Sequence, residues 1–222
     1  MNKIIKNSLI VSCQALEDEP LHGSEIMVKM AEAAKVGGAE GIRANSPADI
    51  RAIREKIKLP LIGLWKTEIN GYPVYITPTY KAAAAVLEAG ADYVAIDCTA
   101  RKRPESLEDI FARLRKNYPD RGIVADISSL KDLEELGDLK PDFLSTTMSG
   151  YTAESRGRAK PDFKLIKELK EATEIKILAE GHYSSGQEAK IALEYGAFAV
   201  VIGSAITRPQ LITDRIVSEM RS

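Results

Sequence analysis

Gly90-Ala91-Asp92-Tyr93-Val94 is the stretch that decides the fold, because two closely similar stretches occur elsewhere in the chain. These are Gly38-Ala39-Glu40-Gly41-Ile42 and Gly196-Ala197-Phe198-Ala199-Val200. In each, a glycine follows a helical pattern and ends the helix in a left-handed conformation, and an apolar run comes next. The repeat predicts one helix-to-strand connection used again and again along the chain.

Apolar runs of strand length extend this repeat over the whole sequence. Eight runs are predicted as strands, at residues 9–14, 41–44, 61–66, 93–98, 122–127, 143–147, 177–180 and 199–202. They are continuous rather than alternating, which is typical of strands buried on both faces of a parallel sheet. Helical periodicity occupies the intervals, at residues 25–34, 48–56, 80–88, 107–117, 130–136, 163–171, 187–195 and 210–220.

Eight β/α units account for the full 222 residues. At about 25–30 residues a unit, this predicts a small (β/α)8 TIM barrel of α/β class, with residues 1–222 as a single domain. A doubly wound parallel sheet is the alternative fold, but no G-x-G-x-x-G motif follows the first strand.

Charge and composition exclude several classes of function. The 31 Lys and Arg residues are balanced by 32 Asp and Glu, so no basic excess exists to neutralise a nucleic-acid backbone. No apolar run approaches the ~18 residues of a membrane span, and residues 1–8 lack the apolar core of a signal peptide. Two cysteines cannot build a disulfide or zinc framework. We expect a soluble, cytoplasmic protein without nucleic-acid or membrane partners.

Polar residues gather where the predicted strands end, which in a barrel is the catalytic face. They are Gln14, Arg43, Lys66, Asp97, Asp126, Thr146, Thr147, Glu180 and the pair Gly203-Ser204. Each alone is as well explained by a solvated strand end or a structural ion pair. Together they would all need desolvating on one face, and such groups are usually retained for function.

Lys66 and Glu180 are the strongest catalytic candidates. Lys66 follows the apolar run Ile62-Gly63-Leu64-Trp65, where burial favours the neutral amine that abstracts a proton or forms an imine. The alternative is a lysine that extends to solvent at the barrel mouth. For Glu180 the alternative is a structural ion pair with Lys66 or Arg43, and for Asp126 it is a cap on the following helix.

The turns after the seventh and eighth strands predict a phosphate site. Barrel enzymes often bind phosphate there, on backbone N–H groups exposed by glycines. Gly181 and Gly203-Ser204 lie in these turns, and Arg208 can add a charge-assisted hydrogen bond. The only histidines, His22 and His182, form no ligand cluster, so we expect neither a catalytic metal nor another cofactor.

With these residues in place, the sequence resembles the bacterial N-acetylmannosamine-6-phosphate 2-epimerase family over essentially its whole length. The matching blocks are Ser12-Cys13-Gln14-Ala15, Gly41-Ile42-Arg43-Ala44-Asn45, Pro60-Leu61-Ile62-Gly63-Leu64-Trp65-Lys66, Tyr75-Ile76-Thr77-Pro78-Thr79, Ala95-Ile96-Asp97-Cys98-Thr99, Ala125-Asp126-Ile127-Ser128, 145–152, Ala179-Glu180-Gly181 and 201–209.

The resemblance implies an isomerase that interconverts N-acetylmannosamine 6-phosphate and N-acetylglucosamine 6-phosphate in sialic acid breakdown, without nicotinamide or metal. Lys66 and Glu180 would form the catalytic centre, and Gln14, Arg43 and Asp126 would hold the sugar. The turns at Gly181 and Gly203-Ser204, with Arg208, would hold the phosphate. Enzymes of this family are generally dimeric, so a homodimer is expected, to which the apolar residues of segment 210–220 could contribute.

The chemistry of C2 epimerisation fits these residue types. A proton α to the C1 carbonyl must be removed and returned to the other face, so the site must lower the pKa of the lysine or couple the lysine to a partner. Glu180 would favour the ammonium, so burial and Arg43 must offset it. Three alternatives are weighed: a class I aldolase-type lyase with an imine on Lys66, a non-catalytic phosphosugar-binding barrel, and a metal-dependent pentose-phosphate epimerase, whose ligands the sequence lacks.

Overall fold

Eight parallel strands close into a barrel in sequence order in the computed structural model, which describes residues 1–222. They are β1 (Leu9–Cys13), β2 (Gly41–Asn45), β3 (Leu61–Leu64), β4 (Tyr93–Asp97), β5 (Gly122–Asp126), β6 (Phe143–Ser145), β7 (Lys176–Glu180) and β8 (Ala199–Ile202). The first and last strands pair in parallel, with Leu9 opposite Val200, and this pairing closes the sheet. The predicted (β/α)8 barrel is confirmed.

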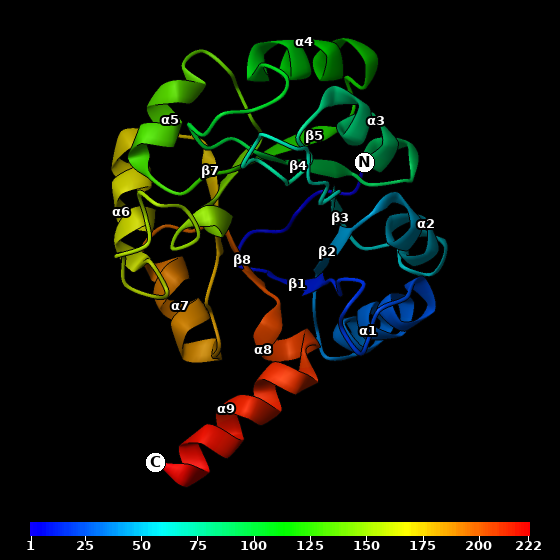
Figure 1. Cartoon of the computed structure of the whole chain (residues 1–222), viewed down its shortest axis with the longest axis vertical. Helices are drawn as coiled ribbons and strands as arrows, with labels where there is room; N and C mark the ends of the chain where they lie inside the picture. Colours follow the sequence, from blue (N-terminus) through cyan, green and yellow to red (C-terminus); the bar gives the residue numbers. More distant parts are fainter.

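Helices surround the strands in Figure 1, and one helix leaves the ring. They are α1 (Ser24–Val36), α2 (Pro47–Lys56), α3 (Tyr80–Glu88), α4 (Leu107–Asn117), α5 (Leu130–Leu136), α6 (Phe163–Ala172), α7 (Gly186–Glu194), α8 (Ser204–Thr207) and α9 (Pro209–Arg221). Helix α9, red in Figure 1, projects away from the barrel, and its main contacts are with α8. None of the helices combines the length and apolar character needed to span a bilayer.

Local sequence signals set where these helices begin and end. The Thr79 hydroxyl accepts the N–H of Ala82 at the start of α3, and Ser106 caps α4 in the same way through Asp109. The three repeated glycines have φ values of 99° at Gly38, 109° at Gly90 and 107° at Gly196. These values confirm the positive-φ helix endings predicted from the repeat.

The strands are buried on both faces, as the continuous apolar runs predict. On β4, Val94 and Ile96 pack against the helices, whereas Tyr93 and Ala95 point into the barrel. Inside, Tyr93 meets Phe143 edge to face with ring centroids 5.6 Å apart, at the amino ends of their strands. Because apolar side chains fill this end, the space for a ligand lies at the carboxyl end.

Three local differences from the predicted elements occur at that carboxyl end. Strand β3 ends at Leu64, two residues early, because the chain leaves the barrel and Lys66 pairs antiparallel with Ile76. Strand β6 ends at Ser145 because Thr146–Met148 forms a 3-10 turn, η1. The short helix α8 lies directly after β8, where the sequence predicted only a connection.

Candidate active site

A cavity of about 710 Å³ opens at the carboxyl ends of the strands, a volume typical of small-molecule sites. Eight of the predicted site residues line it: Gln14, Arg43, Lys66, Glu180, Gly181, Gly203, Ser204 and Arg208. Asp126 is the exception. It is fully buried behind Arg43 and does not line the cavity, so the expectation that it holds the sugar directly is replaced by a supporting position.

Lys66 presents its amine to the cavity without an ion-pair partner in the protein. The hairpin that pairs Lys66 with Ile76 fixes its backbone, and its N–H donates to Asn45 Oδ1 at 2.9 Å. Burial lowers the pKa of Lys66 to about 8, with further lowering by Arg208 and Arg43 and partial opposition from Glu180. With a pKa of about 8, roughly one tenth of Lys66 is the free amine at pH 7, far more than for an ordinary lysine.

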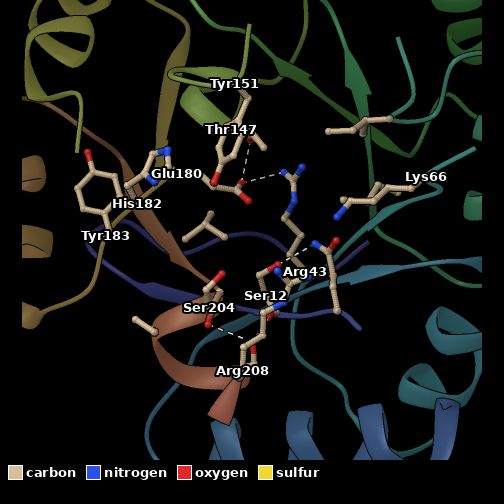
Figure 2. Close-up of a pocket in the computed structure, with 18 of the residues that line it drawn as sticks. Ser12, Arg43, Lys66, Thr147, Tyr151, Glu180, His182, Tyr183, Ser204 and Arg208 are labelled. Carbon is tan, nitrogen blue, oxygen red and sulfur yellow. Dashed lines mark hydrogen bonds and ion pairs between the residues drawn. The ribbon is translucent and has the colours of Figure 1, made fainter. Parts of the chain in front are cut away.

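Arg43 is the centre of a buried charge cluster. Its Nη2 lies 2.6 Å from Asp126 Oδ2, and its Nη1 lies 3.2 Å from Asp126 Oδ1 and 3.0 Å from Glu180 Oε2. Burial by itself lowers the pKa of Arg43, but Asp126 and Glu180 outweigh it and raise the pKa. In the view of Figure 2, the Arg43 guanidinium lies between Glu180 and Lys66.

Glu180 has one bonded and one free carboxyl oxygen. Its Oε2 receives every contact that the protein gives the side chain, from Arg43, Thr147 and Ser145. Its Oε1 has no protein partner, and the residue lines the cavity. Burial raises the pKa of Glu180, and the Asp126 charge adds to this, while Arg43 and the two hydroxyls oppose it. The free oxygen suits a carboxyl group that hydrogen-bonds and exchanges a proton with a ligand.

Unpaired polar atoms mark where a ligand would bind. Gln14 Nε2 donates to Ser12 Oγ at 2.7 Å, but the buried Gln14 Oε1 has no partner. The backbone N–H groups of Gly181, His182 and Gly203 also have no acceptor in the protein, and all three residues line the cavity. Free backbone N–H groups on the glycine turns after β7 and β8 are the kind of donors that bind anions in barrel enzymes.

Arg208 lies beside these turns and is held in place by the β1–α1 loop. Its Nη2 contacts Glu19 Oε2 at 2.8 Å, and Gln210 Nε2 donates to the other oxygen of Glu19 at 3.0 Å. The Glu19 carboxylate contacts only Nη2 of the Arg208 guanidinium. The remaining N–H groups of Arg208 are available to an anion in the cavity.

Several cavity residues were not predicted from the sequence. Most come from loops or lie beside the strand ends, and they include Ser12, Tyr75, Tyr151, His182, Tyr183 and, from helix α9, Arg215. Tyr151 stacks on His182 with ring centroids 4.8 Å apart, and His182 adopts a positive φ of 63° directly after Gly181. The glycine turn was the available signal for His182, whereas nothing in the sequence placed Tyr151 beside it.

Asp97 is the strand-end carboxylate that the structure separates from the cavity. It pairs with Arg101 at 2.5 Å and accepts a hydrogen bond from the Thr99 hydroxyl at 2.7 Å. No group of three or more His, Cys, Asp or Glu side chains is placed to hold a metal ion. The ionisable groups that line the cavity include the Lys66 amine, the carboxyl groups of Glu180 and Glu68, and the guanidinium groups of Arg43 and Arg208.

A parallel barrel that combines free backbone N–H groups beside its last two strands with a lysine of lowered pKa is typical of barrel enzymes that act on phosphorylated small molecules. The family model described as "Putative N-acetylmannosamine-6-phosphate epimerase" matches residues 27–222. The chain belongs to this family, and the resemblance inferred from the sequence is confirmed.

Known relatives match this chain along almost their whole length. The chain is 47% identical over 221 residues to a "Putative N-acetylmannosamine-6-phosphate 2-epimerase" of Listeria welshimeri, covering 98% of this chain and 94% of the relative. It is 48% identical over 216 residues to a protein with the same description from Caldanaerobacter subterraneus subsp. tengcongensis, covering 96% and 91%. The solved N-acetylmannosamine-6-phosphate 2-epimerase of Clostridium perfringens superposes with a TM-score of 0.92 at 44% identity, covering 96% and 93%.

Proposed function

We propose that the chain is an isomerase that interconverts N-acetylmannosamine 6-phosphate and N-acetylglucosamine 6-phosphate in sialic acid breakdown. The observation that carries the chemistry is Lys66, a half-buried amine with a pKa of about 8 and no ion-pair partner, in a cavity shared with Glu180. In the open-chain sugar the C2 proton is acidic because it is α to the C1 aldehyde. Lys66 removes this proton, and reprotonation on the opposite face gives the epimer.

The other groups stabilise the negative charge that develops on O1. The Glu180 carboxyl, its pKa raised by burial, donates a proton from Oε1 to an oxygen of the sugar and takes it back, which also assists ring opening. Arg43 remains charged and supplies a fixed positive potential beside the enediol-like intermediate. Asp126 acts through Arg43, whose guanidinium it holds at 2.6 Å.

Turnover in D2O tests proton abstraction directly. We expect the epimerised product to carry one solvent deuterium at C2, detected by NMR, and C2-deuterated substrate to react more slowly than the protiated sugar. Product without solvent deuterium, together with equal rates for the two substrates, would exclude the mechanism. Borohydride treatment during turnover separates the imine alternative, because an aldolase-type lyase would leave a reduced adduct on Lys66.

The anion site is proposed to hold the 6-phosphate, which gives Arg208 a measurable role. In an Arg208→Met variant the loss of a charge-assisted hydrogen bond should raise KM for the phosphorylated sugar about 10–100-fold. The KM for unphosphorylated N-acetylmannosamine should change little. Arg51→Met, which replaces an exposed arginine on α2, is the matched control. Equal loss for both sugars would show that Arg208 does not recognise the phosphate.

The homodimer expected from the resemblance is supported by helix α9, which we propose packs on a second copy of the chain. No residue of α9 is buried, and Ile216 and Met220 are 48% and 80% exposed. An apolar helix face that projects from the barrel is typical of a subunit interface. We expect a dimer by sedimentation equilibrium and dissociation in an Ile216→Asp/Met220→Asp variant. Val36→Asp, at an 89% exposed position of α1, should leave the dimer intact, and a monomeric parent protein would contradict the proposal.

A further inference from the structure

The hydroxyl groups of Thr147 and Ser145 lie beside Glu180, within hydrogen-bond distance of its carboxyl group, and Thr147 also reaches Asp126. Thr147 Oγ1 lies 2.8 Å from Asp126 Oδ1, 3.0 Å from Glu180 Oε2 and 2.8 Å from Ser145 Oγ. Ser145 Oγ also lies 3.2 Å from Glu180 Oε2. Ser145 ends β6 and Thr147 follows it in η1, so both hydroxyls are held by ordered backbone.

Each hydroxyl has a single hydrogen to donate, so Thr147 can donate to Asp126, to Glu180 or to Ser145, one at a time, and two kinds of arrangement matter for Glu180. In the first, Thr147 donates to Asp126, and Ser145 donates to Glu180 or to Thr147. In the second, Thr147 donates to Glu180, and Ser145 donates to Thr147. The second arrangement gives Glu180 Oε2 the Thr147 donor, the closer of the two hydroxyls, in addition to Arg43 Nη1, while Asp126 keeps both of its contacts to Arg43. A rotation of two hydroxyl hydrogens is enough to pass between them.

We propose that Thr147 is a positioning residue for the epimerisation, whose hydroxyl donates to Asp126 while Glu180 holds its proton and turns to Glu180 Oε2 once that proton has left. The inference rests on the proposed function, in which the proton passes between Glu180 Oε1 and an oxygen of the sugar. Thr147 then compensates the new charge on one carboxyl oxygen as the other gives up its proton. No heavy atom has to move, so the compensation costs little reorganisation.

The remaining groups that face Glu180 stay in place when Thr147 is changed. They are Arg43 from β2, Asp126 from β5, Lys66 after β3 and Tyr151 after η1. Arg43 favours the Glu180 carboxylate, and Asp126 disfavours it. A Thr147→Val variant keeps the shape of the side chain and removes the donor alone. Thr147→Ser keeps the donor and serves as the matched conservative variant.

The test is a titration of Glu180 in the substrate-free protein, followed by ¹³C NMR of glutamate carboxyl carbons, with Glu180→Gln identifying the resonance. Because hydrogen bonds to the charged form lower a carboxyl pKa, Thr147→Val should move the midpoint up by about one pH unit. Thr147→Ser should return it to the parent value. In turnover, Thr147→Val should lower kcat about tenfold with little change in KM, and Thr147→Ser should restore it.

The outcomes separate this inference from the proposed function. A midpoint that does not move in Thr147→Val overturns the inference, and so does a moved midpoint with an unchanged kcat. Ser145→Ala adds a second measurement, since Thr147 can still reach Glu180 without it and the midpoint should shift less. The titration needs no turnover. A parent protein that fails the D2O test would overturn the function and leave the hydroxyl arrangement measurable on its own.

Discussion

A Lys66→Met variant is expected to lose about 10²- to 10⁴-fold of its kcat, the full contribution of a positioned general base. Methionine keeps the length and apolar stem of the side chain, so the cavity wall is preserved. The Lys66 side chain makes no hydrogen bond or ion pair that its loss would break, and its backbone N–H still donates to Asn45. Measurement of kcat and KM with both epimers checks the prediction, and KM should change far less than kcat.

The pH dependence of the parent enzyme follows from the same amine. Lys66 has a pKa of about 8, and the ammonium form that predominates below this value cannot accept the C2 proton. The rate kcat/KM should therefore rise with pH and level off above about pH 8. This rise of kcat/KM with pH should be absent from the residual activity of Lys66→Met. If kcat/KM of the parent enzyme falls between pH 7 and pH 9, the free amine of Lys66 is not the active form and the prediction is wrong.

An exposed lysine supplies the control for this variant. Lys81 on α3 is exposed and forms no ion pair, so Lys81→Met should retain parental kcat and KM. Both variants should keep the circular dichroism spectrum of the parent, which confirms that the barrel still forms. Normal turnover by Lys66→Met would exclude Lys66 as the base and would point to Glu180, whose carboxyl also lines the cavity and whose pKa is raised by burial.

The barrel was predictable from the sequence because a strand that is buried on both faces is apolar at nearly every residue. A run such as Tyr93–Asp97 is apolar on both faces, and the repeated glycine turns mark where each unit restarts. The strand that ended early shows the limit of this signal. Trp65 and Lys66 continue the apolar run of β3, but the hairpin partner Ile76 lies ten residues further on, and local periodicity does not report such pairing.

The candidate site was predictable as a set of strand ends but not as a geometry. Strand order places Lys66, Arg43 and Glu180 on one face of the barrel. It does not determine that Arg43 would point inward, at 1% exposure, and hold Asp126 away from the cavity. That arrangement depends on side chains meeting across the barrel interior. The positions of Thr147 and Tyr151 depend likewise on the η1 turn and the loop after it, which carry no strong local pattern.

An Arg43→Met variant is expected to lose about 3–5 kcal/mol of unfolding free energy at neutral pH, because removing one partner of a buried ion pair leaves charge uncompensated. Asp126 is fully buried, so its carboxylate cannot be hydrated instead, and Glu180 is only 12% exposed. Against a typical total stability of about 5–15 kcal/mol, this is a large fraction. Denaturant titration of parent and variant measures it.

The size of this loss should depend on pH, and its sign follows from the Glu180 carboxyl. Without Arg43, the charge that lowers the pKa of Glu180 is gone, and burial raises that pKa further above its value in the unfolded chain. A group of this kind contributes stability that is present at low pH and is lost as the pH rises through its folded pKa. The deficit of Arg43→Met relative to the parent should therefore be smaller at pH 5 than at pH 8.

A second substitution separates lost packing from unpaired charge. Arg43→Met/Asp126→Asn replaces the stranded carboxylate with an amide, which can still accept from Thr147, and should recover part of the stability that Arg43→Met loses. The comparison is Lys29→Met, which breaks a pair with Glu32 whose lysine is 79% exposed and should cost no more than about 1 kcal/mol. If the double variant is less stable than Arg43→Met, the cost lies in packing, and the cluster is not held together by its charge. If the double variant is more stable, the unpaired charge of Asp126 accounts for part of the loss. The role of Arg43 is then to allow the carboxyl groups of Asp126 and Glu180 to lie beside the cavity, with one oxygen of Glu180 free for the substrate.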